Sequence, residues 1–263
     1  MATAKQMFTM TVKEMREGLQ ESRTVIVPIG ITEQHGNHLP LSVDVHNAVE
    51  IASRASGQCG CFVAPALHYA FSGGTLPGTI NLSPQVYSLM LMDICRSLVV
   101  QGFRNILLLL GHGGTENTRA THDAAEMFQR LSPDLSGISV SVVPFWELSP
   151  TYMRSMDEGD FHAARYETSM MLYWHPELVK MDEAVLDPPA VVKDLREDPD
   201  GYLVKTKALD HPFVEAKLTQ RTDMHVGVMG ALDDISPELG RQVAEEASAA
   251  LADFVRQLEA ANP

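Results

Sequence analysis

The feature that most constrains the fold of this chain is an aliphatic run, ILLLL, at residues 106–110, which ends in GHGG at residues 111–114. Its apolarity is continuous rather than alternating, and this pattern predicts a strand buried on both faces, as in the middle of a parallel sheet. The β-branched run TVIVPIG, at residues 24–30, predicts a second buried strand. Two such strands require a sheet that is covered by other elements on both sides.

Helical and strand patterns alternate along the rest of the chain. They predict further strands at residues 61–70 and 137–146, and helices at residues 11–22, 48–55, 83–101, 115–131, 163–180 and 236–260. A serine followed by proline opens two of these helices, at Ser83 and Ser236, and Gly102 ends the first of the two. We therefore expect an α/β protein with a mostly parallel sheet. Because we find neither an internal repeat nor a linker, we expect one domain over residues 1–263.

The composition argues against two classes of partner. The 263 residues carry a formal net charge of −14, which repels nucleic-acid phosphates and anionic lipid surfaces. The chain has no apolar signal region near its first residue and no stretch of about twenty apolar residues. Its three cysteines, Cys59, Cys61 and Cys95, match no metal or disulfide pattern and favour free thiols. We expect a cytoplasmic protein that binds neither nucleic acid nor membranes.

One segment, at residues 187–223, is rich in proline and charge and contains only short apolar pieces. It is longer than an ordinary connection between helices and strands. We expect it to be either a cover over an active site or a contact between subunits.

Polar residues gather directly after the first buried strand, in EQHGNHLPLSVDVH at residues 33–46. Ligands of open α/β sheets bind at the carboxyl ends of the strands. Glu33 and His35 can converge in a turn, and a glycine and a proline supply the bends that return Asp44 in the same loop. Two carboxylates and an imidazole suit Zn²⁺, Mn²⁺ or Fe²⁺. The segment therefore indicates a metal site.

Two further segments can add ligands to this site. His112 stands at the carboxyl end of the aliphatic strand and faces the same crevice if the two strands are neighbours. Glu167 follows in DFHAARYETS, at residues 160–169, with His162 five residues before it. Five candidate ligands suit a two-metal site, in which one carboxylate bridges ions about 3.5–4 Å apart. Asp44 is the candidate for this bridge.

At these positions the sequence resembles the creatininase family of metal-dependent hydrolases. EQHGNHLPLSVD, LPGTINLS, LGHGG and HAARYETSMML are similar to the family's successive motifs EQHGxHLPLxTD, FPGTIS, NGHGG and HAGxxETS. The likeness covers residues 24–179, and residues 227–242 resemble the family's C-terminal stretch. It implies a three-layer α/β/α sandwich, two divalent metal ions per chain, a small-molecule substrate whose cyclic amide or related C–N bond is hydrolysed by metal-activated water, and a homo-oligomer such as a hexamer.

Carried over to this sequence, the family pattern assigns Glu33, Asp44 and His112 to one metal. His35 and Asp44 go to the other metal, together with an acidic residue. Creatininase supplies that acid two residues after the strand-end histidine, in HYEN, where this chain has glycine. We therefore expect Glu167, in the ETS motif, to be the last ligand, with Glu116 as the alternative.

The same resemblance assigns His162 to proton transfer. An imidazole titrates near neutral pH and can donate a proton to a leaving nitrogen or oxygen. Gly113 and Gly114 leave room and backbone N–H groups for an oxyanion. Creatininase has a tryptophan and an aspartate shortly before this histidine, whereas this chain has EGDF at residues 158–161, which argues against creatinine as the substrate.

Three functions fit these observations. The first is a hydrolase of a small cyclic amide or formamide, and the second uses the same metals to open a cyclic ketone or lactone such as an oxidised inositol. The third is a scaffold or maturation protein without activity, which the apparently complete ligand set disfavours. His38 and His46 are expected to have structural roles or to orient ligands through their second ring nitrogen.

Overall fold

A five-stranded sheet forms the centre of the protein, which we describe from a computed structural model of residues 3–132 and 135–263. Its strands lie in the order β1 (Lys5–Gln6), β3 (Phe62–Val63), β2 (Thr24–Ile29), β4 (Asn105–Leu110) and β5 (Ser139–Pro144), and every neighbouring pair is parallel. The strands β2 and β4 pair along their whole length, from Thr24 opposite Asn105 to Ile29 opposite Leu110. The two buried strands are therefore neighbours in the middle of the sheet, as expected.

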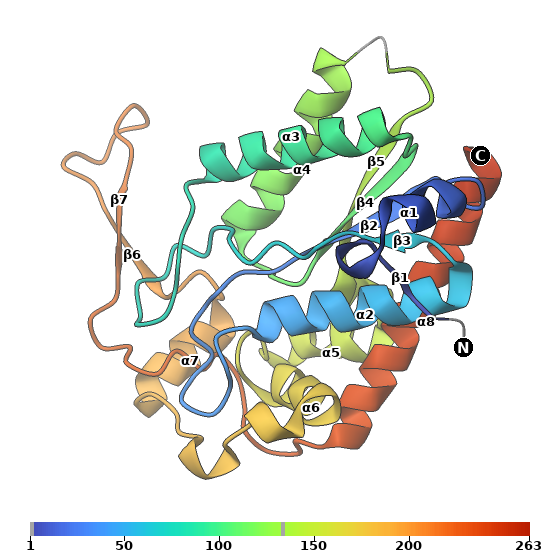
Figure 1. Cartoon of the computed structure of the whole chain (residues 1–263). Coiled ribbons are helices and arrows are strands. Elements are labelled where there is room, and N and C mark those ends of the chain that lie inside the picture. Colours follow the sequence, from blue (N-terminus) through green and yellow to red (C-terminus); the bar gives the residue numbers. More distant parts are fainter. Residues whose placement is uncertain (1–2, 133–134) are drawn as a thin grey trace.

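Helices cover both faces of this sheet (Figure 1). One face carries α1 (Val12–Gly18), α3 (Pro84–Gln101) and α4 (Thr115–Leu131), and the other carries α2 (Val43–Cys59) and α8 (Pro237–Ala261). The helices α5 (Pro150–Glu158) and α6 (Arg165–Trp174) pack against α8. The arrangement is the three-layer α/β/α sandwich that the sequence predicts.

Each face of the sheet has its own apolar core. Leu108 of β4 packs in the core that contains Tyr87 of α3, whereas its neighbour Leu107 packs in the core that contains Leu251 of α8. Successive side chains of a strand point to opposite faces. Because both faces are covered, residues 106–110 of β4 are all apolar, and complete burial of each leucine contributes about 1.5–3 kcal/mol.

The helix ends follow the signals in the sequence. The Ser83 side chain accepts a hydrogen bond from the Val86 N–H at 3.4 Å, and Ser236 accepts one from Leu239 at 3.2 Å. Gly102 ends α3 with a left-handed backbone, at φ of 108°. Glycine adopts this conformation without the steric cost that other residues meet.

Several predicted boundaries are wrong. The strand expected at residues 61–70 contains only the two residues of β3, since residues 64–70 make single bridges to other segments instead of a ladder. The helix expected at residues 48–55 begins earlier, at Val43, and the helix expected at residues 163–180 ends at Trp174, two residues before a proline. A proline disfavours helical backbone in the residue before it.

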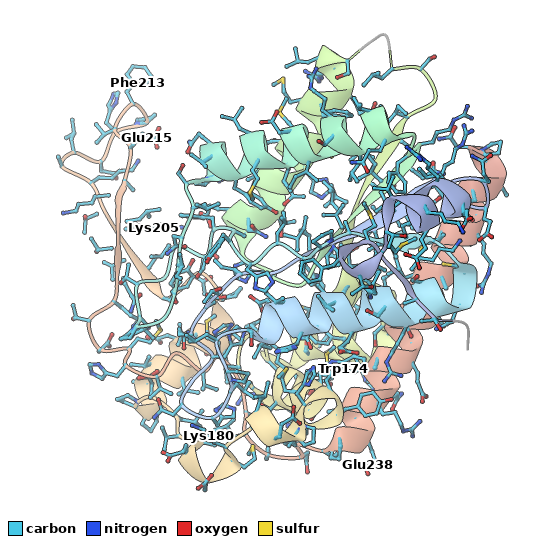
Figure 2. All side chains as sticks on the ribbon, in the orientation of Figure 1. Trp174, Lys180, Lys205, Phe213, Glu215 and Glu238 are labelled. Carbon is cyan, nitrogen blue, oxygen red and sulfur yellow. The ribbon has the colours of Figure 1, made fainter. Side chains whose placement is uncertain are left out.

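The proline-rich segment at residues 187–223 is structured. It contains α7 (Pro189–Glu197) and an antiparallel hairpin of β6 (Leu203–Thr206) and β7 (Lys217–Gln220). The hairpin projects from the body of the protein, and Figure 2 shows Phe213 and Glu215 at its far end. The remaining regular elements of the described residues are short 3₁₀ helices at Met7–Thr9, Phe145–Leu148, Pro176–Leu178 and Met181–Glu183. No helix within the described residues is both long and apolar enough to cross a membrane.

Candidate metal centre

The candidate site lies at the carboxyl ends of β2 and β4. Glu33 follows β2 and His112 follows β4, so the pairing of these strands brings both residues to one edge of the sheet. His112 Nδ1 lies 3.1 Å from Glu33 Oε2. This is the crevice in which open α/β sheets bind ligands.

Asp44 reaches the same edge from the first turn of α2, not from the loop that the sequence predicts. The helix approaches because both strands end in glycine. A Cβ atom on Gly111 would lie 2.1 Å from the Asp44 carbonyl oxygen, and one on Gly30 would lie 2.5 Å from the Val45 nitrogen. Any larger residue at either position would push the N-terminus of α2, and Asp44 with it, away from the sheet.

Glu167 enters the site from the first turn of α6, where it is buried. Its Oε2 atom accepts a hydrogen bond from the Ala163 N–H at 2.6 Å. Ala163 has a left-handed backbone, with φ of 53°, which is uncommon for a residue other than glycine and costs about 1–3 kcal/mol. Surrounding contacts therefore hold the turn between His162 and Glu167 in one conformation.

The structure brings all five candidate ligands together. They form two groups that share Asp44, one with Glu33 and His112 and one with His35 and Glu167, and the potential ligand atoms of each group lie within 4.8 Å of one another. A third group joins His162 to Glu33 and His35. Among residues 3–132 and 135–263, no such group contains Glu116, so the geometry favours Glu167 over this alternative.

Several potential ligand atoms of the five residues lie close together but do not form hydrogen bonds with one another. His35 Nε2 lies 3.2 Å from Asp44 Oδ1, and His112 Nδ1 lies 3.1 Å from Asp44 Oδ2. Yet Glu33 Oε2, His35 Nε2 and Asp44 Oδ2 are buried and have no partner in hydrogen-bond geometry. Buried polar atoms that lack partners are costly. Atoms that converge without bonding to each other, in a set of imidazoles and carboxylates, fit Zn²⁺ or Mn²⁺.

The pKa values of the clustered residues also indicate that the site favours positive charge. Burial by itself lowers the pKa of His35, but the Asp44 and Glu167 carboxylates outweigh it and raise this pKa to about 9. Burial opposes ionisation of Glu33 as well, yet the His112 and His162 imidazoles lower its pKa to about 2. The Glu33 carboxylate therefore retains its charge and attracts cations to the cluster.

Neighbouring groups orient the candidate ligands. The Nδ1 atom of His35 lies 3.1 Å from the Glu33 carbonyl oxygen, to which it can donate, and this leaves Nε2 facing Asp44. Ser72 donates a hydrogen bond to Glu33 Oε1. His38 Nε2 lies 3.0 Å from Thr168 Oγ1, next to Glu167. Such contacts fix the direction of a ligand atom.

His46 has a different place. Its ring lies 4.3 Å from the ring of His175, centroid to centroid, outside the cluster of candidate ligands. The sequence allows either histidine to support a ligand. In the described part of the chain, His38 contacts the neighbour of Glu167, whereas His46 packs against His175.

His162 lines the cavity next to the cluster, with its ring centroid 4.3 Å from that of His35. Its Nε2 atom lies 2.8 Å from the Gln34 carbonyl oxygen and 3.0 Å from the Gln34 side-chain nitrogen. When protonated, Nε2 can donate to the carbonyl; when unprotonated, it can accept from the amide. Gln34 therefore offers a partner to both states of the imidazole.

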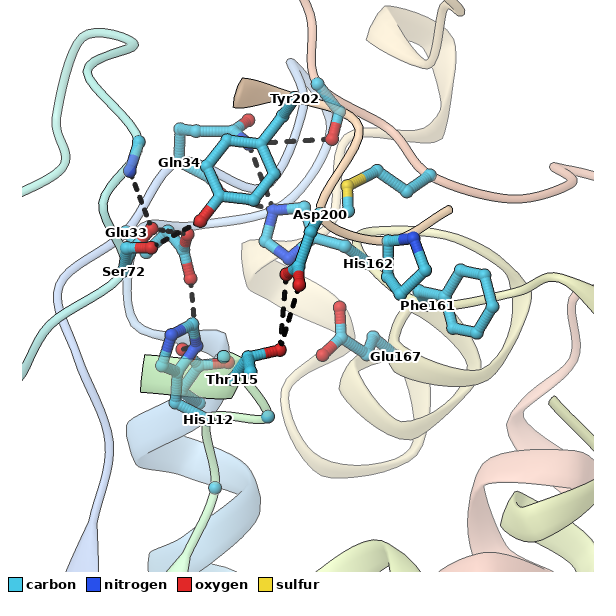
Figure 3. Close-up of a pocket in the computed structure, with 18 of the residues that line it drawn as sticks. Glu33, Gln34, Ser72, His112, Thr115, Phe161, His162, Glu167, Asp200 and Tyr202 are labelled. Atoms are coloured by element: carbon cyan, nitrogen blue, oxygen red, sulfur yellow. Dashed lines mark hydrogen bonds and ion pairs between the residues drawn. The ribbon is translucent and has the colours of Figure 1, made fainter. Parts of the chain in front are cut away.

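Four of the candidate ligands, Glu33, Asp44, His112 and Glu167, line a cavity of about 230 Å³. Residues 199–224 supply part of its wall, and three contacts dock this segment on the body of the protein (Figure 3). Tyr202 donates to the Ser72 carbonyl oxygen at 2.7 Å, Gln220 accepts from the Thr75 N–H at 2.5 Å, and Asp200 accepts from the Thr115 hydroxyl at 3.2 Å. The segment is thus an active-site cover, one of the two roles expected for it.

Sequence reasoning missed Ser72, Asp200 and Tyr202 as cavity residues. For Ser72 a signal existed, because the glycine-rich loop that contains it follows the strand next to β2. For Asp200 and Tyr202 the sequence offers no signal, since their position depends on how the cover folds back over the site.

Known proteins resemble the chain over most of its length. A family model, creatininase, described as creatinine amidohydrolase, matches residues 9–255. The creatinine amidohydrolase of Pseudomonas putida is 28% identical over 183 residues, 63% of this chain and 70% of that protein. The 3-dehydro-scyllo-inosose hydrolase of Thermotoga maritima is 26% identical over 260 residues, 95% of this chain and 81% of that protein.

A solved structure resembles this one closely. A mutant creatininase described as the Zn-Zn type superimposes with a TM-score of 0.75 and 25% sequence identity, over 97% of this chain and 98% of that chain. This chain therefore belongs to the creatininase family of metal-dependent hydrolases.

Proposed function

We propose that this protein is a binuclear metal-dependent hydrolase that adds water across the C–N bond of a small cyclic amide or a related compound. Glu33, Asp44 and His112 would hold one ion, and His35, Asp44 and Glu167 would hold the other. The single observation that carries the proposal is the position of Asp44, whose two carboxylate oxygens face the His35 and His112 imidazoles at 3.2 and 3.1 Å. A carboxylate shared in this way suits a two-metal site.

Metal ions bound at this site would lower the pKa of a water molecule and polarise the carbonyl group of the substrate. His162 is the proposed catalytic residue. It would carry a proton to the nitrogen of the breaking C–N bond, so that the products are a carboxylate and an amine. Gln34 would hold the imidazole in place before and after this transfer, through its carbonyl oxygen and its side-chain amide. Gly113 and Gly114 line the cavity beside His112 and leave space for the substrate carbonyl.

The test is a comparison of metal content with hydrolysis. Protein loaded with Mn²⁺ or Zn²⁺ is expected to hold close to two ions per chain and to open cyclic amides, with release of a carboxylate that is measured by mass spectrometry. Asp44→Ala is expected to lose both properties. A folded protein that binds no metal after reconstitution contradicts the site, and a loaded protein that opens no cyclic amide or formamide contradicts the substrate class.

A second candidate function has support from one relative. The inosose hydrolase of Thermotoga maritima matches 95% of this chain. The same centre could open a cyclic ketone or lactone such as an oxidised inositol, with cleavage of a C–C or C–O bond. A parallel assay with inososes distinguishes the two candidates, because the products differ in mass and contain no amine.

The proposal also includes the setting in which the enzyme works. We propose that residues 1–263 act as one hydrolase domain, in a homo-oligomer in the cytoplasm. The free thiols of Cys59, Cys61 and Cys95 suit a reducing compartment. Light scattering coupled to size-exclusion chromatography tests the oligomeric state.

A further inference from the structure

The cavity combines two kinds of lining. Besides the candidate metal ligands, the wall of the cavity contains the apolar side chains of Trp146, Met156, Phe161, Met224 and Met229. These side chains come from four separate parts of the chain, so the apolar wall is a product of the tertiary structure. Apolar side chains in the wall favour a substrate that buries an apolar portion of its own.

Within the described part of the chain, the cavity carries negative charge without a lysine or arginine to balance it. Among the described residues that line the cavity, none is lysine or arginine. Arginine and lysine are the side chains that proteins use to bind carboxylate and phosphate groups. The net charge of −14 adds to the effect, because it repels anions and attracts cations during the encounter. Among the described residues, an anionic substrate therefore meets no lysine or arginine in this cavity.

Asp200 adds a negative charge to the cavity beyond those of the candidate metal ligands. It reaches into the cavity from the cover, and Figure 3 shows it directed toward Thr115. The Thr115 hydroxyl lies 3.2 and 3.4 Å from the two Asp200 oxygens. A hydroxyl donates one proton, whereas a carboxylate offers about four acceptor positions. Most of the hydrogen-bonding capacity of Asp200 is thus left for a ligand.

From this arrangement we infer that Asp200 determines specificity by accepting a hydrogen bond from a cationic or N–H group of the substrate. The substrate class is a cyclic amide with an apolar portion and a positive or N–H-bearing group that reaches Asp200 while the reacting carbonyl lies at the candidate metal ligands. The inference rests on the proposed function, in which the carbonyl lies at the metal ligands. It adds the group of the substrate that Asp200 would bind and argues against anions.

The binding test uses three related probes: a phenyl-substituted γ-lactam and its analogues with an aminomethyl or a carboxyl group on the phenyl ring. Trp146 lines the cavity, and Trp174 packs on Arg54 elsewhere, with 4.7 Å between the guanidinium carbon and the ring centroid. In a Trp174→Phe background, Trp146 is the remaining tryptophan and its fluorescence reports binding. Calorimetry on the unmodified protein checks the affinities. Both metal-free and metal-loaded protein are measured.

We expect the aminomethyl probe to bind more tightly than the carboxyl probe. Asp200→Asn is expected to reduce the ratio of their affinities about tenfold, because it removes one charge-assisted hydrogen bond. Asp210→Asn is the matched control: it removes the same charge from the same segment, at an exposed position outside the cavity lining, and is expected to leave the ratio unchanged.

An unchanged ratio in Asp200→Asn would overturn the inference, as would tightest binding of the carboxyl probe. Failure of the proposed function has a different signature. If the protein binds no metal or hydrolyses no amide while Asp200→Asn still changes the ratio, the recognition by Asp200 stands and the reaction is wrong. If amides are hydrolysed but the ratio does not respond to Asp200→Asn, the reaction stands and the inference is wrong.

Discussion

Replacing Asp44 with asparagine is the sharpest test of a shared ligand. Asp44 belongs to both groups of candidate ligands, whereas Glu167 belongs to one of them. Asn keeps the shape of the side chain and the helical position, but it lacks the charge and the second strong donor oxygen. We therefore expect Asp44→Asn to lower the affinity for both ions and Glu167→Gln to lower the affinity for one of them.

The size of the effect follows from linkage. An ion at a concentration 100 times its dissociation constant stabilises the folded protein by about 2.7 kcal/mol, so two independent ions contribute about 5 kcal/mol. For a chain of this length, each kcal/mol raises the melting temperature by about 2–4 °C. The wild-type protein is expected to gain about 10–20 °C when metal is added. In Glu167→Gln the melting temperature should rise by about half as much when metal is added, and in Asp44→Asn it should hardly rise.

Differential scanning calorimetry in a metal titration measures these gains, and elemental analysis gives the number of ions per chain. Circular dichroism in chelator verifies that each variant folds. Glu116→Gln is the matched control, since Glu116 lies in the first turn of α4 and in neither group of candidate ligands. If Asp44→Asn reduces the metal-dependent gain in melting temperature only as much as Glu167→Gln does, the two ions do not share Asp44. If Glu116→Gln loses an ion, the last ligand is Glu116.

Three further predictions follow from single contacts. His162→Ala should keep both ions but lower kcat by about 10²–10⁴-fold, in steady-state assays of the loaded enzyme, and unchanged turnover would remove it from the mechanism. Asp187 is buried and accepts backbone N–H groups from residues 225–227 at 2.6–3.1 Å, so Asp187→Ala should cost about 3 kcal/mol in urea denaturation, and a loss below about 1 kcal/mol would contradict this. Burial by itself raises the pKa of Glu246, but hydrogen bonds from Ser149 and Thr151 lower it to about 2. A folded-state pKa below the unfolded value contributes stability above pH about 4.5 that is lost as the pH falls toward 2. Glu246→Gln should therefore be about 1 kcal/mol less stable than the wild type at pH about 6 and equally stable near pH 2, whereas a difference that does not vary with pH would refute the assignment.

The sequence by itself determined the central strands and the residues that gather at their ends. A strand buried on both faces needs continuous apolarity, and this local property of β2 and β4 predicts a covered parallel sheet. Parallel strands bring their carboxyl ends to one edge, which is why Glu33 and His112 could be placed together. The helix starts at Ser83 and Ser236 were equally local, because an N-cap involves only the next three residues.

Other features depend on contacts between distant segments, and the sequence could not supply them. It placed Asp44 in a loop, because nothing local shows that Gly30 and Gly111 admit the backbone of α2 against the sheet. It also left open which of two acids completes the cluster, a question of distance in three dimensions.

The cover shows the same division most clearly. Composition identified residues 187–223 as an unusual connection, but a cover and a subunit contact share that composition. Only the tertiary structure decided that Asp200 and Tyr202 face the cavity, because their positions depend on hydrogen bonds to Thr115 and Ser72. These contacts join residues 85 and 130 positions apart, and no local pattern encodes such pairs.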